Sequence, residues 1–123
     1  MKKFNKKKLP SRHTTIGADK APQRSFYYAM DLTEKDVAKP FVGVVSTWNE
    51  AAPCNINLMK QAQSVKKGVQ ATGGTPREFC TITVTDGIAM GHEGMKSSLI
   101  SRDVIADSTA VSYTHLRAHE TSE

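Results

Sequence analysis

Phe41-Val-Gly-Val-Val-Ser-Thr-Trp48 is an apolar run rich in β-branched residues, and this composition predicts a buried β-strand. Pro40, just before it, suits the first position of a strand. A second run of this kind, Phe79-Cys-Thr-Ile-Thr-Val84, predicts a second strand. The chain between the two runs therefore sets how the strands are connected.

That connection has the pattern of an α-helix over residues 55–72. Apolar residues recur there at steps of four, three and four, which places them on one helix face: Leu58, Ala62, Val65 and Val69. Asn55 suits the N-cap, and Gly73-Gly74 suits the C-terminal stop. A crossover of this length makes the strands parallel and the connection right-handed, so the sequence predicts the α/β class.

Two segments with chemically useful side chains follow these strands. Cys54 lies in the loop after the first strand, and Asp86 lies in a Gly-rich loop, residues 85–95, after the second. Because parallel strands end at the same edge of a sheet, both loops are expected at the edge where open α/β proteins bind ligands. A soft thiolate and a hard carboxylate at one edge would suit a mixed metal site.

The rest of the chain gives weaker signals. Residues 1–10 are predicted to be a basic disordered arm, and residues 21–30 a short helix with Pro22 in its first turn. Another helix is expected over residues 94–106. Residues 11–39 are otherwise mixed and polar.

Length and composition limit the class of protein. The 123 residues suffice for one small domain, of which 38% are hydrophobic and 7% aromatic. No run approaches the roughly 18 apolar residues of a membrane span, and no apolar segment follows the basic N-terminus as in a signal peptide. Two cysteines do not make a disulfide framework, so a reducing cytoplasm is the expected setting, without membrane association.

The positive charge is concentrated at the N-terminus. The chain carries a net charge of +5, but seven Lys and Arg residues and one acidic residue lie within residues 1–20. The remaining residues sum to −1. A solvated tail and a nucleic-acid-binding arm both fit this distribution. Only one aromatic residue, Phe4, lies among these charges, which does not make an interleaved aromatic pattern, so we expect no nucleic-acid partner.

Each candidate ligand has a structural alternative. Cys54 precedes the predicted helix, whose N-terminus would favour a thiolate, but a small apolar residue also suits a turn. Cys80 lies within a predicted strand and is interpreted as a packed thiol. Asp86 could bind Mg²⁺ through its oxygens or could accept hydrogen bonds from its own turn.

Other polar residues carry less specific signals. His92 and Glu93 are candidates for capping the next helix, and for His92 a structural role is favoured over a ligand or acid–base role. Trp48, Asn49 and Glu50 begin the first loop and could line a pocket. His115 and His119 have the spacing of a helical zinc pair, but Leu116 stands where a metalloprotease motif needs Glu.

Several motifs together resemble the N-terminal part of the dihydroxy-acid dehydratase family. The resemblance covers residues 11–108, in order and with sensible spacing. It is carried by Lys39-Pro-Phe-Val-Gly-Val-Val-Ser-Thr-Trp-Asn-Glu-Ala-Ala-Pro-Cys-Asn55, Gly73-Gly-Thr-Pro-Arg-Glu-Phe79, Asp86-Gly-Ile-Ala-Met-Gly-His-Glu-Gly-Met95 and Ser101-Arg-Asp-Val-Ile-Ala-Asp-Ser108, with the shorter Ser11-Arg12 and Ala21-Pro-Gln-Arg24. The resemblance implies the N-terminal part of a three-layer α/β/α domain with a mainly parallel sheet.

The resemblance also implies an activity and its cofactors. The family dehydrates 2,3-dihydroxy carboxylates to 2-oxo acids in valine, isoleucine and pantothenate biosynthesis, with an iron–sulfur cluster and Mg²⁺. Cys54 matches one of three cysteines of a [2Fe–2S] cluster, and Asp86 matches a Mg²⁺ ligand. The intact enzyme would be a homodimeric lyase acting on a small dihydroxy acid. The alternatives are a phosphogluconate or sugar-acid dehydratase of the same family, and a small non-enzymatic binding module with a basic arm.

The chain departs from the family pattern in three ways. The family runs to well over 500 residues, so the other cluster cysteines, further Mg²⁺ ligands and the Ser base lie beyond residue 123, and the isolated chain is expected to be inactive. Ser97 and Ile100 stand where Tyr and Pro are common. Residues 109–123 resemble a translated sequencing adapter and are interpreted as an artefact, which would also remove the His115/His119 pair.

Overall fold

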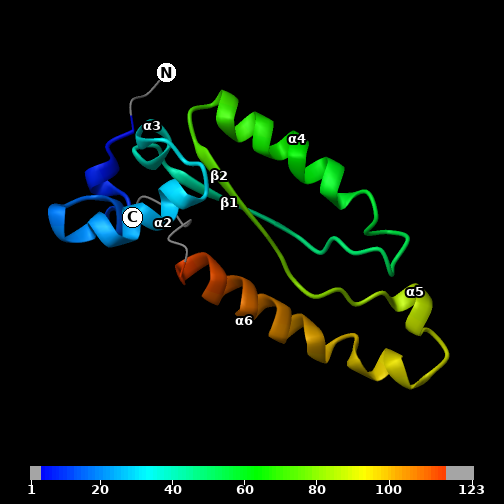
Figure 1. The fold of residues 1–123 in the computed structure, drawn as a ribbon. Helices are drawn as coiled ribbons and strands as arrows, with labels where there is room; N and C mark the ends of the chain where they lie inside the picture. The colour runs from blue at the N-terminus through cyan, green and yellow to red at the C-terminus, as the bar shows by residue number, and fades with distance from the viewer. Residues whose placement is uncertain (1–3, 116–123) are drawn as a thin grey trace.

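The computed structural model describes residues 4–115, which form a mixed α/β arrangement (Figure 1). Along the chain, the elements of this part are η1 (Lys6–Lys8), α1 (Arg12–Thr15), η2 (Ala18–Lys20), α2 (Ala21–Ala29), α3 (Glu34–Val37), β1 (Phe41–Ser46), α4 (Leu58–Ala71), β2 (Thr75–Cys80), α5 (Asp86–Ala89), η3 (Glu93–Ser97) and α6 (Ile100–His115). No helix within these residues has the length and apolar character needed to cross a membrane.

The sheet confirms the parallel α/β prediction. β1 and β2 are hydrogen-bonded neighbours and run parallel, with Phe41 opposite Thr75 and Ser46 opposite Cys80. The backbone N–H of Thr75 also donates to Pro40 O, at 2.8 Å, and the Thr75 hydroxyl donates to Asp36 O. These bonds fix where the second strand enters the sheet.

The second strand begins and ends earlier than the sequence indicates. Residues 79–84 were expected to form it, but β2 is Thr75–Cys80 and residues 81–85 belong to no strand or helix. Gly73 has a φ of 91°, so the chain turns into the strand directly after α4. Because Ser46 is the last residue of β1, the β-branched residues beyond Cys80 have no partner strand. Pairing with β1 therefore outweighs local β-propensity.

Helix α4 covers one face of the two strands, as the apolar periodicity predicts, but Val65 of the predicted apolar face is 52% exposed (Figure 1). Ala62 of α4 and Val44 of β1 are both buried. A Cβ atom at Gly74 would lie 2.9 Å from Val69 Cγ1, so glycine permits the close approach of helix and strand. The predicted N-cap is wrong, because the helix begins at Leu58 and Asn55 hydrogen-bonds elsewhere.

The opposite face of the strands is covered from both ends of the chain. Phe41 is fully buried there, with its ring edge-on to the ring of Tyr27 at a centroid distance of 5.3 Å. Tyr113 of α6 packs edge-on against Phe79 and lies over Gly43, where a Cβ atom would be 2.5 Å from the tyrosine ring. Figure 1 shows α4 and α6 on opposite sides of the strands.

The C-terminal helix is longer than predicted and begins later. Residues 94–106 were expected to be helical, whereas a 3-10 turn, η3, precedes α6. Gly91 has a φ of 87°, which ends the preceding turn, and His92 caps η3. The delay follows from these local turns, because the chain must reverse between α5 and α6 (Figure 1).

The basic N-terminal segment contacts the domain. Residues 1–10 were expected to be disordered, but within the described residues 4–10 a 3-10 turn forms and Leu9 is buried. The Lys6 ammonium donates to Lys39 O at 2.7 Å and lies 4.0 Å from the centroid of the Phe41 ring. Part of the positive charge therefore stabilises the fold through a hydrogen bond and a cation–π contact.

Helix α2 forms as predicted, with Pro22 in its first turn.

The short helix α3 is stabilised by a capping box, which makes its stability depend on pH. The Thr33 hydroxyl and backbone N–H both hydrogen-bond to the Asp36 carboxylate and, with help from Lys39, hold its pKa below the ordinary value. A lowered pKa means that the carboxylate stabilises the fold above its unfolded-state pKa and loses this effect as the pH falls through the folded-state value. Asp36→Asn is expected to lower the free energy of unfolding by about 0.5–1 kcal/mol at pH 7.

Denaturant titrations at several pH values test this expectation. The difference between Asp36→Asn and the unchanged chain should shrink as the pH falls below about 4. Asp31→Asn is the matched control, because Asp31 is exposed and close in sequence but lies outside the capping box. A difference that persists unchanged at low pH would contradict the assignment.

Candidate metal centre

Both candidate loops leave the sheet at its carboxyl edge. Ser46 and Cys80 are the last residues of their strands and lie opposite each other, and the N–H of Thr81 donates to Ser46 O at 2.9 Å. The segments after β1 and β2 therefore start side by side. This confirms that the loops of Cys54 and Asp86 begin at a common sheet edge.

Thr47 ties these two segments together. Its carbonyl oxygen accepts a hydrogen bond from Asn55 Nδ2 at 2.9 Å and another from the Thr83 hydroxyl at 2.6 Å. Asn55 Nδ2 also lies 2.7 Å from the Thr47 hydroxyl oxygen. Asn55 is the neighbour of Cys54, and Thr83 precedes Asp86 by three residues, so one residue anchors both candidate loops.

Asn49 shapes the first loop and joins the same network. Its Oδ1 accepts from the backbone N–H groups of Ala51 and Ala52 at 2.8 and 2.9 Å, which is an Asx-type turn. Its Nδ2 donates to the Thr83 hydroxyl. The sequence analysis expected Asn49 to line a pocket but did not predict that its side chain shapes the loop. An asparagine that follows a strand and precedes small residues could have indicated such a turn.

A cavity of about 330 Å³ lies between these loops, and its lining tests the pocket prediction. Trp48 and Asn49 line it, whereas Glu50 is not among its lining residues. Thr81, Ile82 and Thr83 supply the wall on the side of β2. The two loops therefore border an open space at the sheet edge.

Cys54 is exposed in the turn before α4. The N–H of Asn55 donates to Ala52 O at 3.0 Å, which closes the turn around the cysteine. The helix itself starts only at Leu58, so Cys54 does not adjoin the helix N-terminus as the sequence indicated. The loop presents the thiol to solvent.

Asp86 is the first residue of the short helix α5 and not part of an open loop. Its backbone carbonyl accepts from the N–H of Met90 at 2.8 Å, and its Oδ1 accepts a hydrogen bond from the hydroxyl of buried Ser98. Asp86 also lines a cavity of about 150 Å³ with Thr47 and Arg102. Ser98 therefore orients one carboxylate oxygen of an otherwise exposed side chain.

The remaining candidates have structural roles or fall outside this edge. His92 Nδ1 accepts from the N–H of Gly94 at 3.0 Å, which leaves the proton of a neutral ring on Nε2, 3.0 Å from Ile88 O. This confirms the structural interpretation of His92. Cys80 was expected to be packed but is exposed at the end of β2, 3.7 Å from the Ser46 hydroxyl.

The possible metal ligands do not form a complete site in the described part of the chain. Within residues 4–115, no three His, Cys, Asp or Glu side chains gather closely enough to hold a metal ion. His115 ends α6, and its predicted partner His119 lies outside the described residues. Among the described residues, the loop after β1 thus presents the exposed Cys54 thiol, and the segment after β2 presents the exposed Asp86 carboxylate.

Comparison with known proteins identifies the family to which the chain belongs. A family model described as the dihydroxy-acid/6-phosphogluconate dehydratase N-terminal domain matches residues 39–120. The chain belongs to this family, which confirms the resemblance drawn from its motifs. The match extends past Ser108, where the motif resemblance ended, and the interpretation of residues 109–123 as an artefact stays a prediction.

The most similar relatives are of one kind. The chain is 89% identical over 109 residues to the dihydroxy-acid dehydratase of Pelagibacter ubique, an alignment that covers 89% of this chain and 19% of that protein. It is 70% identical over 118 residues to the dihydroxy-acid dehydratase of Parvibaculum lavamentivorans, covering 96% of this chain and 20% of that protein. Dihydroxy-acid dehydratase 2 of Mesorhizobium japonicum is 66% identical over 118 residues, with the same coverage. The chain thus spans about a fifth of the length of these relatives.

Proposed function

We propose that the chain is the N-terminal part of a dihydroxy-acid dehydratase of branched-chain amino acid biosynthesis. The relatives named above support this proposal, and Asp86-Gly-Ile-Ala-Met-Gly-His92 favours it over phosphogluconate and sugar-acid dehydratases. The proposed substrate is a 2,3-dihydroxy-3-methyl carboxylate, which loses its 3-hydroxyl group and its C2 proton as water. The enol that remains becomes the 2-oxo acid.

The side chains at the sheet edge fit the proposed cofactors by their donor chemistry. The Cys54 sulfur suits iron of a [2Fe–2S] cluster, and the Asp86 carboxylate suits Mg²⁺. When bound, these groups would supply Lewis acidity to the leaving hydroxyl and hold the carboxylate end of the substrate. Ser98 would fix the Asp86 carboxylate by its hydrogen bond to Oδ1, and Thr47 would hold both loops in place.

The observation that carries the proposal is the shared anchor at Thr47. Its carbonyl accepts hydrogen bonds from Asn55 and Thr83, so the segments bearing Cys54 and Asp86 belong to one network of hydrogen bonds. Two metals that act on the same small substrate need their ligands on one edge. A binding module would not require a soft and a hard ligand to be placed this way.

The surface of α6 supports the view that the segment belongs to a larger domain. Ile100 and Val104 lie one turn apart on the helix and are each more than half exposed, and both precede the segment interpreted as an artefact. Exposed apolar side chains that follow one another along a helix are typical of a face that further parts of a domain cover. The intact enzyme is proposed to be a cytoplasmic homodimer.

Replacement of Asp86 tests the proposed Mg²⁺ role. A chimera is made in which residues 1–108 replace the corresponding part of the Pelagibacter ubique enzyme. Asp86→Asn in this chimera is expected to raise the Mg²⁺ concentration for half-maximal activity by at least about tenfold, because an amide oxygen carries no charge. The rate of 2-oxo acid formation is measured across a Mg²⁺ titration, with Asp103→Asn as the control at an exposed carboxylate of α6.

The same assay defines the limits of the isolated chain. The 123-residue chain alone is expected to form no 2-oxo acid from 2,3-dihydroxy-3-methylbutanoate, because single ligands do not hold either cofactor. Turnover by that chain, or an unchanged Mg²⁺ dependence in Asp86→Asn, would contradict the proposal.

A further inference from the structure

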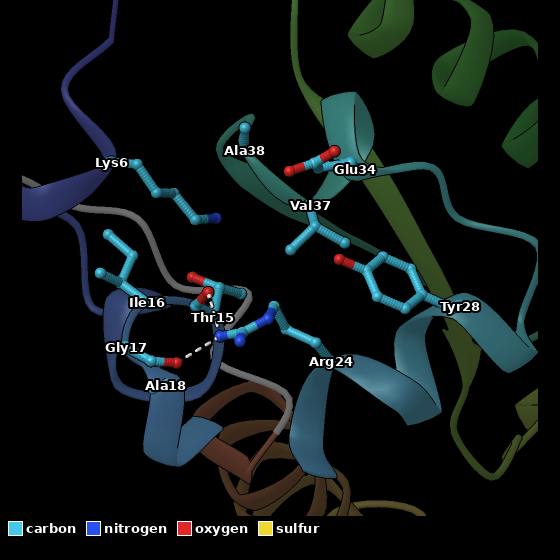
Figure 2. A pocket seen from close by; sticks show the side chains of 10 residues that line it. All are labelled: Lys6, Thr15, Ile16, Gly17, Ala18, Arg24, Tyr28, Glu34, Val37 and Ala38. Atoms are coloured by element: carbon cyan, nitrogen blue, oxygen red, sulfur yellow. Dashed lines mark hydrogen bonds between the residues drawn. The ribbon is translucent and has the colours of Figure 1, made fainter. Parts of the chain in front are cut away.

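A cavity of about 550 Å³ lies in the N-terminal part of the molecule, and neither Cys54 nor Asp86 lines it (Figure 2). Its walls come from η1, the turn between α1 and η2, α2 and α3. The residues lining it are Lys6, Thr15, Ile16, Gly17, Ala18, Arg24, Tyr28, Glu34, Val37 and Ala38. This volume is within the usual range of small-molecule sites.

One wall carries a fixed positive charge. Arg24 Nη1 donates to Thr15 O at 3.2 Å and to Gly17 O at 2.6 Å, which holds the guanidinium in place. The hydrogen bonds of Arg24 to other described residues use this one nitrogen, so Nε and Nη2 remain as donors. The Lys6 side chain approaches the same space and adds a second positive charge (Figure 2).

The facing wall carries a carboxylate and a phenol. Figure 2 shows the Glu34 carboxylate and the Tyr28 hydroxyl directed toward the space that the Arg24 guanidinium also faces. Glu34 is exposed and has no ion pair with any cation among the described residues. Opposite charges thus face each other across the cavity without direct contact.

An apolar surface completes the cavity. Val37 is buried and contributes its side chain between the charged walls (Figure 2), and Ile16, Ala18 and Ala38 line the cavity as well. A ligand that matches this lining carries a negative group, a positive group and a short aliphatic chain. Such a ligand would satisfy both facing charges at once, whereas a simple anion or cation would leave one unpaired.

We propose that this cavity binds an aliphatic α-amino acid. Its carboxylate accepts hydrogen bonds from Arg24, its ammonium donates to Glu34, and its side chain lies against Val37. The site is separate from the proposed metal centre and does not depend on the dehydratase proposal.

Calorimetric titration of the 123-residue chain tests the proposal with four probes. L-leucine is the reference, 3-methylbutylamine lacks its carboxylate, 4-methylpentanoate lacks its ammonium group, and glycine lacks its side chain. Leucine is expected to bind saturably, and each of the other probes at least about tenfold more weakly. Absence of saturable leucine binding, or equal binding of any probe, would overturn the proposal.

Glu34→Gln removes the negative charge with little change of shape. It is expected to weaken leucine binding at least about tenfold while leaving the melting temperature without leucine unchanged, because Glu34 is exposed. Glu50→Gln is the matched control, since Glu50 is exposed and lies outside the cavity. Leucine binding by Glu34→Gln as tight as that of the unchanged chain would overturn the proposed contact.

Discussion

Cys54→Ser is expected to remove the iron–sulfur cluster from a full-length dehydratase that carries this N-terminal segment. Serine keeps the size of the side chain but replaces a soft sulfur ligand by a hydroxyl, which binds iron poorly. Replacing a residue that only hydrogen-bonds to a metal ligand typically lowers metal affinity or activity by about 10–100-fold. Replacing the ligand itself is therefore expected to lower the dehydration rate by more than about a hundredfold.

The chimera with the Pelagibacter ubique enzyme is the material for this experiment, because the two sequences are 89% identical over 109 residues. Iron content, visible absorbance of the cluster and the rate of 2-oxo acid formation are measured together. Loss of all three in Cys54→Ser with unchanged far-ultraviolet circular dichroism would separate loss of the cluster from unfolding.

Cys80→Ser is the matched control for this substitution. Cys80 is also an exposed thiol, and it ends β2 at the same carboxyl edge of the sheet. The proposal assigns it no ligand role, so its replacement should leave the iron content and the rate unchanged. If the Cys54→Ser variant still binds iron, or if Cys80→Ser loses it, the assignment of Cys54 as the cluster ligand is contradicted.

Phe41→Ala is expected to have the largest effect on stability among single substitutions in the described chain. The side chain is fully buried, packs edge-on against Tyr27 and lies under the Lys6 ammonium. Removing a buried phenylalanine ring typically costs 3–5 kcal/mol, and small domains have free energies of unfolding of about 5–15 kcal/mol. The variant should therefore lose a large part of its free energy of unfolding.

Denaturant unfolding followed by circular dichroism measures this effect. Phe26→Ala is the control, because Phe26 lies on α2 and is 71% exposed. Its substitution should change the free energy of unfolding by no more than about 0.5 kcal/mol. If the two variants lose similar amounts of free energy of unfolding, the proposed contribution of the buried Phe41 ring to stability is contradicted.

Local patterns in the sequence predicted the elements well where the periodicity was strong. The apolar repeat that includes Ala62 placed α4 on the sheet, and the β-branched run from Phe41 gave β1 almost to its observed end. The ends of elements were less predictable. β2 was displaced toward its N-terminus because pairing with β1, through Thr75 and its neighbours, outweighed the β-propensity of residues 81–84.

Several polar residues changed roles because their partners are distant in the sequence. Asn55 has the composition of an N-cap, but its amide reaches back to Thr47. Asp86 was placed in a loop, but it begins α5 and receives a hydrogen bond from Ser98. Lys6 was assigned to a disordered arm, but its ammonium lies over the ring of Phe41. None of these contacts leaves a periodic signal in the chain.

The sequence by itself determined that this chain has a strand, a crossover helix and a parallel strand, and that Cys54 and Asp86 follow the ends of those strands. Periodicity and crossover length are local properties, so they can be read along the chain. Only the tertiary structure decided how the two loops are joined at Thr47 and how Arg24 and Glu34 come to face one cavity. These arrangements depend on hydrogen bonds and packing between residues that are far apart in the sequence.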